Sequence, residues 1–192
     1  MNRINALSMF SGGGIAETYF EDVGIDVRVA NELVPDRAKF YKATHLKTNM
    51  ICGDISKPDI FDKVMCEAKK KNIEFLLATP PCQGMSTLGK RQYDSDKRNS
   101  LIKYVLDAID LLKPKYVLIE NVPKFLELLY DEDGTTYYSD TAKALFPFRI
   151  IDLLKYKYEK DYQIDSKILN AMNYGVPQSR PRAIIKMYKK NI

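Results

Sequence analysis

Short apolar runs alternate with amphipathic stretches along most of the chain. Each apolar run has the length of a buried strand, and most are followed by apolar residues spaced three and four apart, the pattern of a helix face. Runs that predict strands lie at 4–10, 26–30, up to about 51, 75–78 and 116–119. Helices are predicted over 15–23, from Pro35, over 57–71 and over 101–112. This alternation predicts an α/β fold, a parallel sheet with helices on both faces.

Several polar features stand directly after the predicted strands. They are the Ser11-Gly12-Gly13-Gly14 turn, Glu32, Asp54, Cys82 and Glu120. In parallel sheets ligands bind beyond the carboxyl ends of the strands, which all meet at one edge. We therefore expect these residues to line one rim of the sheet and to form the functional site.

Composition narrows the class of protein. The chain has 192 residues and an apolar share of 45%, which argues for one globular domain. No apolar run is long enough for a membrane span, and the first residues lack the pattern of a secretory signal. Cys52, Cys66 and Cys82 are far apart and form no CxxC pair, which favours a reduced, cytoplasmic setting. The net charge of +5 permits a nucleic-acid partner without requiring one.

The first three polar features each have two interpretations. The glycine turn follows a strand and opens a predicted helix, where glycines let the backbone approach a cofactor; a tight turn without a ligand is the alternative. It has neither the GxGxxG spacing of a dinucleotide site nor the lysine of a P-loop. Glu32 could bind a ribose, or be a cap or surface carboxylate. Asp54 could bind an adenine amino group, or cap the next helix.

The segment Thr79-Pro80-Pro81-Cys82-Gln83 places a thiol on a stiff bend. The prolines fix the backbone and remove hydrogen-bond donors. A helix N-terminus or nearby cations would favour the thiolate, which is the nucleophilic form of cysteine. We therefore predict that Cys82 is a nucleophile aimed at the rim, and that Cys52 and Cys66 are inert core residues.

Charged residues later in the chain complete the candidate chemistry. Glu120 ends the fifth predicted strand, where a carboxylic acid could deliver a proton; pairing with an arginine is the alternative. In Gln178-Ser179-Arg180-Pro181-Arg182 two guanidinium groups would lie on the same side of an extended segment. Together they could bind a carboxylate, a phosphate or a base carbonyl. A solvated pair of arginines is the alternative. His45 is the only histidine, which excludes multi-histidine metal sites, and we interpret it as structural or exposed.

Taken in order, these motifs resemble those of the cytosine-C5 DNA methyltransferases. The resemblance spans nearly the whole chain and implies a Rossmann-like S-adenosylmethionine-dependent methyltransferase fold, mostly parallel with an antiparallel last strand. It implies S-adenosylmethionine as methyl donor, S-adenosylhomocysteine as product, and no metal. The segments that carry it are Phe10-Ser11-Gly12, Glu32, Gly53-Asp54-Ile55, Pro80-Pro81-Cys82-Gln83, 96–101, Glu120-Asn121-Val122, 173–177 and 178–182.

The resemblance also implies a role for each matching position. Cys82 would attack cytosine C6, Glu120 would protonate the ring nitrogen, and Arg182 would bind the carbonyl oxygen of the base. Arg180 would support Glu120. The base must be flipped out of double-stranded DNA for this chemistry. The residues expected around the cofactor are Phe10, Ser11, Gly12, Gly14, Glu32, Leu33, Asp54, Ile55, Pro80, Gln83 and Leu101.

The chain departs from the family pattern in three places. Ile15 stands where the family usually has glycine, and Leu33 stands where an aromatic often stacks on the adenine. The chain also ends soon after Arg182, so we expect residues 1–192 to form the catalytic domain without the target-recognition domain and the final helix of the cofactor site. A prokaryotic restriction-modification methylase with a second protein subunit for target recognition is the resulting hypothesis. The alternatives are a shortened or frameshifted chain, a non-catalytic regulatory or cofactor-binding paralogue, and a transfer-RNA methyltransferase.

Overall fold

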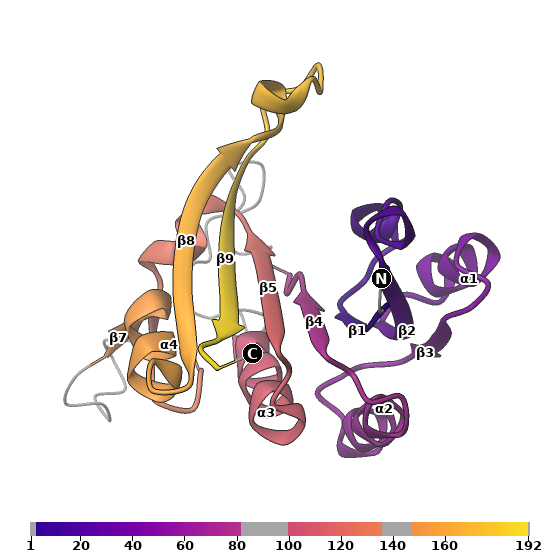
Figure 1. The fold of residues 1–192 in the computed structure, drawn as a ribbon, viewed down its shortest axis with the longest axis horizontal. Coiled ribbons are helices and arrows are strands. Elements are labelled where there is room, and N and C mark those ends of the chain that lie inside the picture. Colours follow the sequence, from indigo (N-terminus) through magenta and orange to yellow (C-terminus); the bar gives the residue numbers. More distant parts are fainter. Residues whose placement is uncertain (1–2, 82–99, 136–146, 192) are drawn as a thin grey trace. The chain divides into compact units, whose positions relative to one another are not determined.

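The protein is described by a computed structural model that covers residues 3–81, 100–135 and 147–191. The chain divides into two compact units (Figure 1). Unit 1 comprises Met1–Thr79 and Asp107–Val117, and unit 2 comprises Pro80–Leu106 and Leu118–Ile192.

Unit 1 contains four parallel strands that are joined through short helices. Strand β1 pairs in parallel with β2 on one side and with β4 on the other, and β2 pairs with β3. The strands are β1 (Ile4–Met9), β2 (Ile25–Glu32), β3 (Asn49–Cys52) and β4 (Phe75–Ala78). The helices are α1 (Pro35–Thr44) and α2 (Pro58–Lys70). The predicted strands and these two helices are thus present, with bounds shifted by a few residues at most.

The core of unit 1 explains why these segments form. The middles of β1 and β4 are apolar and buried, as expected for strands covered on both faces. In β2 Val27, Val29 and Ala30 are buried, and Arg28 between them is half-buried. Helix α2 buries Val64, Met65 and Ala68, which lie on one face at helical spacing. Helices α1 and α2 both have proline in their first turn, where its missing N–H costs no hydrogen bond.

The helix predicted over 15–23 is not present. Two short 3-10 turns, η1 (Ile15–Glu17) and η2 (Glu21–Val23), take its place. The apolar residues that suggested a helix are exposed: Ile15 by 83%, Tyr19 by 74% and Val23 by 70%. A short helix in water depends on packing of its apolar face, and within the described residues this face has no such packing.

Unit 2 is built around a long antiparallel hairpin. Strand β8 (Tyr162–Asn170) pairs with β9 (Pro181–Lys189) from Tyr162↔Lys189 to Asn170↔Pro181. A small antiparallel pair joins β6 (Leu129–Tyr130) to β7 (Phe148–Arg149). The remaining elements are η5 (Pro123–Glu127), α4 (Ile150–Tyr158) and η7 (Ala171–Tyr174).

Two elements belong partly to each unit. They are α3 (Ile102–Leu112) and β5 (Tyr116–Asn121), both close to the predicted bounds. The hydrogen-bonded strand order of the main sheet is β3-β2-β1-β4-β5-β9-β8, with β8 and β9 antiparallel. The predicted α/β class is therefore confirmed. Among the described residues, no helix combines the length and the apolar character that crossing a bilayer requires.

Candidate functional site in two parts

The glycine turn lies at the carboxyl end of β1. Phe10, Gly12 and Gly14 have φ values of 60°, 58° and 80°, the left-handed region that glycine adopts without strain. The Phe10 carbonyl accepts a hydrogen bond from Thr79 Oγ1 at 2.9 Å, which helps to hold this residue in an unusual conformation. Among the described residues other than its chain neighbours, no heavy atom would lie within 4 Å of a Cβ at Gly12. The turn therefore leaves open space beside Gly12, where a ligand could approach the backbone.

Glu32 fastens this turn to the end of β2. Its Oε2 accepts a hydrogen bond from the Gly12 backbone N–H, and its Oε1 accepts one from the Val34 N–H, both at 2.8 Å. The side chain is nearly buried, with the residue 5% exposed. Each carboxylate oxygen can accept more than one hydrogen bond, so Glu32 retains capacity for a ribose hydroxyl. Its structural role was not among the alternatives that the sequence suggested.

Asp54 organises the turn that follows β3. Its Oδ1 accepts from the Ser56 N–H at 2.9 Å and from Ser56 Oγ at 2.7 Å. It does not cap α2, because Lys57 occupies that position. Asn31 links this turn to β2, since its side-chain amide donates to the Gly53 carbonyl at 3.1 Å. The ends of β2 and β3 are thereby joined, although no motif in the sequence pointed to Asn31.

The other residues predicted around a cofactor fall into two groups. Leu33 is exposed beside Glu32 and could form an apolar wall. Ser11 and Ile55 are buried, so their side chains offer little to a ligand. Ser11 donates through both its N–H and its hydroxyl to the Asn31 carbonyl, at 3.0 and 3.3 Å. The departure at Ile15 causes no backbone conflict, because Ile15 is not among the residues with positive φ.

Gly14 is required by close packing rather than by open space. A Cβ there would lie 2.3 Å from His45 Nε2 and 2.9 Å from Tyr41 Cδ2. The His45 Nε2 also lies 3.0 Å from the Gly14 carbonyl oxygen, and the rings of His45 and Tyr41 are 4.3 Å apart. His45 thus supports the turn, in line with its interpretation as a structural residue.

A buried carboxyl group lies close to the same turn. Glu17 is almost inaccessible, and the hydroxyl of Ser8 donates to its Oε1. Its Oε2 has no hydrogen-bond partner among the described residues. Burial raises the pKa of Glu17 above its ordinary value, although the hydrogen bond from Ser8 acts in the opposite direction. Glu17 was not predicted as a functional residue, because it lies within a segment with helical spacing of apolar residues.

Unit 2 has a candidate feature of its own, an ion pair between β5 and β9. Arg182 Nε lies 2.9 Å from Glu120 Oε1, with the side chains 22% and 30% exposed. The Arg182 Nη1 also donates to the Pro181 carbonyl at 2.7 Å, which fixes the plane of the guanidinium group. Pairing with an arginine was one of the two interpretations of Glu120. The arginine is Arg182, whereas Arg180 had been expected to support Glu120.

Arg180 contributes through its backbone. Its N–H donates to Asn170 Oδ1 at 2.9 Å, and its carbonyl accepts from the Ala171 N–H at 3.2 Å. These bonds close the tip of the β8–β9 hairpin. The Arg180 residue itself is exposed.

Asn121 joins the loops that follow β4 and β5. Its side-chain amide donates to the Pro80 carbonyl at 3.1 Å, and its Oδ1 accepts from the Val122 N–H at 2.8 Å. Pro80 is buried and Leu101 is half-buried. Cys82 and Gln83 lie outside the described residues, so their predicted roles stay predictions. The prediction that Cys52 and Cys66 are core residues is wrong, because both are exposed.

Comparison with known proteins identifies the family. The sequence model of the family described as C-5 cytosine-specific DNA methylase matches residues 4–192. The chain belongs to this family. Over 97% of its length it is 43% identical to the Type II methyltransferase M1.HgaI of Avibacterium volantium. It is 31% identical over 93% of its length to the Type II methyltransferase M.AquIA of a Picosynechococcus species.

The methylase match covers only part of these relatives. The chain spans 50% of M1.HgaI and 69% of M.AquIA. A solved DNA modification methyltransferase encoded within an E. coli prophage has the same fold, with a TM-score of 0.71 at 23% identity. That match covers 97% of this chain and 47% of the solved chain. The predicted Rossmann-like methyltransferase fold is confirmed.

Proposed function

We propose that this chain is the catalytic part of a DNA (cytosine-5)-methyltransferase that acts on a flipped-out cytosine in double-stranded DNA. The observation that carries the proposal is the Glu120–Arg182 ion pair at the end of β5. It brings together the two residues that family resemblance assigns to the ring nitrogen and the carbonyl oxygen of the base. These two atoms are neighbours on cytosine, so one base could contact both side chains.

The ion pair also suggests how the two residues would share the base. If Arg182 moves from Glu120 Oε1 to the base carbonyl, the carboxyl group of Glu120 is left free to face the ring nitrogen. One arginine would then serve first as the partner of Glu120 and then as a ligand of the base.

The remaining steps follow from the chemistry of cytosine. The Cys82 thiolate would form a bond to C6 while the ring nitrogen takes the proton from Glu120, and the electron pair of the C5–C6 double bond would make C5 nucleophilic. S-adenosylmethionine, when bound, supplies an electrophilic methyl group to C5. Methyl transfer would leave S-adenosylhomocysteine. Loss of the C5 proton, with return of the ring-nitrogen proton to Glu120, would then re-form the double bond and expel the Cys82 thiolate.

The glycine turn of unit 1 fits a nucleoside-bearing cofactor. Gly12 leaves open space beside the backbone, and Glu32 keeps free lone pairs for ribose hydroxyls. Asp54 uses only Oδ1 in the hydrogen bonds described for it, which leaves Oδ2 for an adenine amino group. Exposed Leu33 would provide one apolar wall. We therefore assign this turn to S-adenosylmethionine, with no metal required.

The covalent step can be tested by trapping. DNA that contains 5-fluorocytosine should form a stable adduct with the methylase in the presence of S-adenosylmethionine, because fluorine blocks the final elimination. Cys82→Ala should abolish the adduct, and the matched variant Cys52→Ala should not. An adduct that persists in Cys82→Ala would refute the assignment of the nucleophile.

We further propose that a second protein subunit carries target recognition and packs on unit 1. A groove of about 570 Å³ lies beside the glycine turn, and exposed Ile15, Phe40 and Leu46 line it. Exposed apolar residues bordered by polar ones, here Glu21, Asp22 and Lys47, are typical of a protein contact.

The test of this second proposal is a methyl-transfer assay on DNA with and without the companion chain. We expect the isolated chain to bind S-adenosylmethionine weakly and to show only salt-sensitive, non-specific affinity for DNA. If the isolated chain methylates a defined sequence at a rate that the companion does not improve, the two-subunit proposal is wrong. In this proposal the enzyme works in the cytoplasm of a prokaryote, as part of a type II restriction-modification system.

A further inference from the structure

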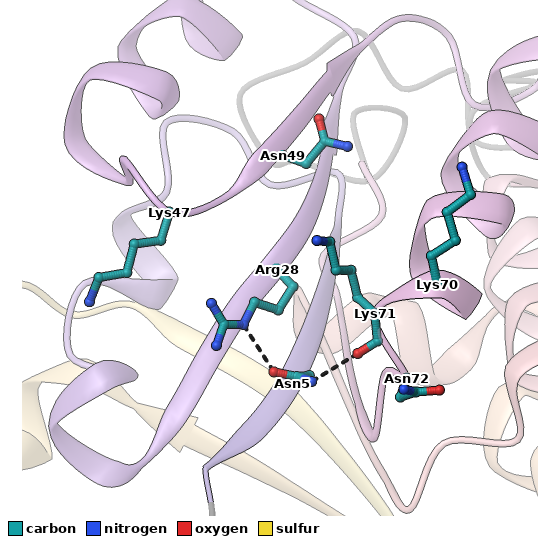
Figure 2. A pocket seen from close by; sticks show the side chains of 7 residues that line it. All are labelled: Asn5, Arg28, Lys47, Asn49, Lys70, Lys71 and Asn72. Atoms are coloured by element: carbon teal, nitrogen blue, oxygen red, sulfur yellow. Dashed lines mark hydrogen bonds between the residues drawn. The ribbon is translucent and has the colours of Figure 1, made fainter.

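A second pocket in unit 1 lies at the opposite ends of its strands from the glycine turn. It has a volume of about 370 Å³ and is formed near the starts of β1 and β3 and the end of α2 (Figure 2). Four of its lining residues are cations, Arg28, Lys47, Lys70 and Lys71, and the others are asparagines. No carboxylate lines it among the described residues. The pocket is therefore rich in donors and in positive charge.

The floor of the pocket is held by hydrogen bonds. Arg28 Nε donates to Asn5 Oδ1 at 3.0 Å, and Asn5 Nδ2 donates to the Lys71 carbonyl at 2.8 Å. Figure 2 shows Asn5 joined in this way to both residues. Arg28 Nη2 also contacts Asp26 at 3.0 Å. These contacts fix the Arg28 guanidinium group and the backbone of Lys71 before any ligand arrives.

The charge of this floor is not balanced. Arg28 shares its carboxylate partner, Asp26, with Arg3, whose guanidinium group makes two hydrogen bonds to it. Lys71 is exposed, and it shares the field of one nearby carboxylate, Glu67, with Lys70, which holds the close ion pair to it. The Arg28 Nη1 and the Lys71 ammonium group thus remain available for an anion.

The other two lysines that line the pocket, Lys47 and Lys70, already have ion-pair partners. Lys47 pairs with Glu21 at 2.9 Å, and Lys70 pairs with Glu67 at 2.7 Å. Such exposed pairs are weak and exchange readily with solvent. Lysines at the end of a helix such as α2 also have a purely structural use, since they complement the helix dipole. A ligand site therefore has to depend on Arg28 and Lys71 rather than on Lys47 and Lys70.

We propose that this pocket binds a phosphate group. Arginine and lysine are the side chains that bind phosphate best, and asparagine amides add neutral donors. The phosphate could belong to a DNA backbone or to a free phosphate-bearing molecule, and both have the same recognition chemistry. The site is separate from the proposed cofactor site, because it lies at the amino ends of the strands.

The first arm of the test uses inorganic phosphate. Backbone amide NMR shifts of the full chain are followed as phosphate replaces chloride at constant ionic strength. We expect saturable shifts at Arg28, Lys71 and Asn72, with half-saturation at about tenfold higher phosphate in Lys71→Gln, the loss expected for one charge-assisted hydrogen bond. Lys69→Gln is the matched control, because it removes an equal charge from the same helix end outside the pocket.

The second arm uses a DNA duplex and identifies the source of the phosphate. The logarithm of the binding constant falls linearly with the logarithm of salt concentration, and each DNA phosphate that the protein neutralises steepens this slope by about 0.9. A shallower slope in Lys71→Gln than in Lys69→Gln assigns the site to the DNA backbone. Equal slopes together with saturable phosphate binding assign it to a free phosphate-bearing molecule. Failure of phosphate to shift the pocket amides, with equal slopes, overturns the proposal.

Discussion

Replacing Glu32 by glutamine should destabilise the fold as well as the proposed cofactor site. The carboxylate accepts two backbone N–H groups at 2.8 Å, from Gly12 and Val34. Glutamine retains one acceptor oxygen but directs its NH₂ group at the other N–H. The loss of one hydrogen bond to a charged group is worth about 1.5–3 kcal/mol. Because Gly12 is only partly buried and water can replace part of the loss, we expect about 2 kcal/mol for Glu32→Gln.

The measurement is urea unfolding followed by circular dichroism, supported by thermal melts. In a chain of this size about 2 kcal/mol lowers Tm by roughly 4–8 °C. Glu21→Gln is the matched control: it removes the same charge from an exposed pair with Lys47, and should cost under about 1 kcal/mol. If Glu32→Gln is no less stable than Glu21→Gln, Glu32 does not hold the glycine turn in place.

Two further predictions concern the environment of the turn. Gly14→Ala should lower the free energy of unfolding by about 3 kcal/mol, because strain at positive φ adds to contact with His45. Gly24 has a similar φ but open space, so Gly24→Ala should lower it by only about 1–2 kcal/mol. Equal losses of stability in thermal melts would contradict the packing argument. Because burial raises the pKa of Glu17, the unfolded state loses this proton first, and stability should fall as pH rises above the ordinary value of 4.5. Glu17→Gln should lack this decline in urea unfolding between pH 4 and 8; an unchanged decline would mean that another group causes it.

The strands of unit 1 were predictable because burial on both faces leaves a continuous apolar run. Strand β4 has the predicted bounds, 75–78, for this reason. The segment 15–23 shows the limit of the same argument. Its apolar residues have the correct spacing for a helix, but spacing says only that a face is apolar. Spacing does not say whether other described residues pack against that face.

The positions of the candidate site residues could be predicted from the sequence, but the contacts that these residues make could not. The rule that ligands bind beyond strand ends selected Glu32, Asp54 and Glu120. The bond from Gly12 to Glu32 depends on how the ends of β1 and β2 meet, which spacing along the chain does not encode. The choice of Arg182 over Arg180 was also beyond reach, since both would lie on the same side of an extended segment.

The effect of a change in length on the Glu120–Arg182 ion pair depends on where in the β8–β9 hairpin the change is made. Arg182 faces Leu169 in the ladder, and side chains alternate between the two faces of a strand. A single-residue deletion in β9 that shifts the pairing would turn Arg182 away from Glu120. Within the exposed tip, residues 173–178 lie beyond the bonds of Asn170 to Met172, Ser179 and Arg180, so the length of this segment can change without altering that pairing. A label on this hairpin is therefore better placed in the tip than in β9, where it would disturb the pairing that positions Arg182.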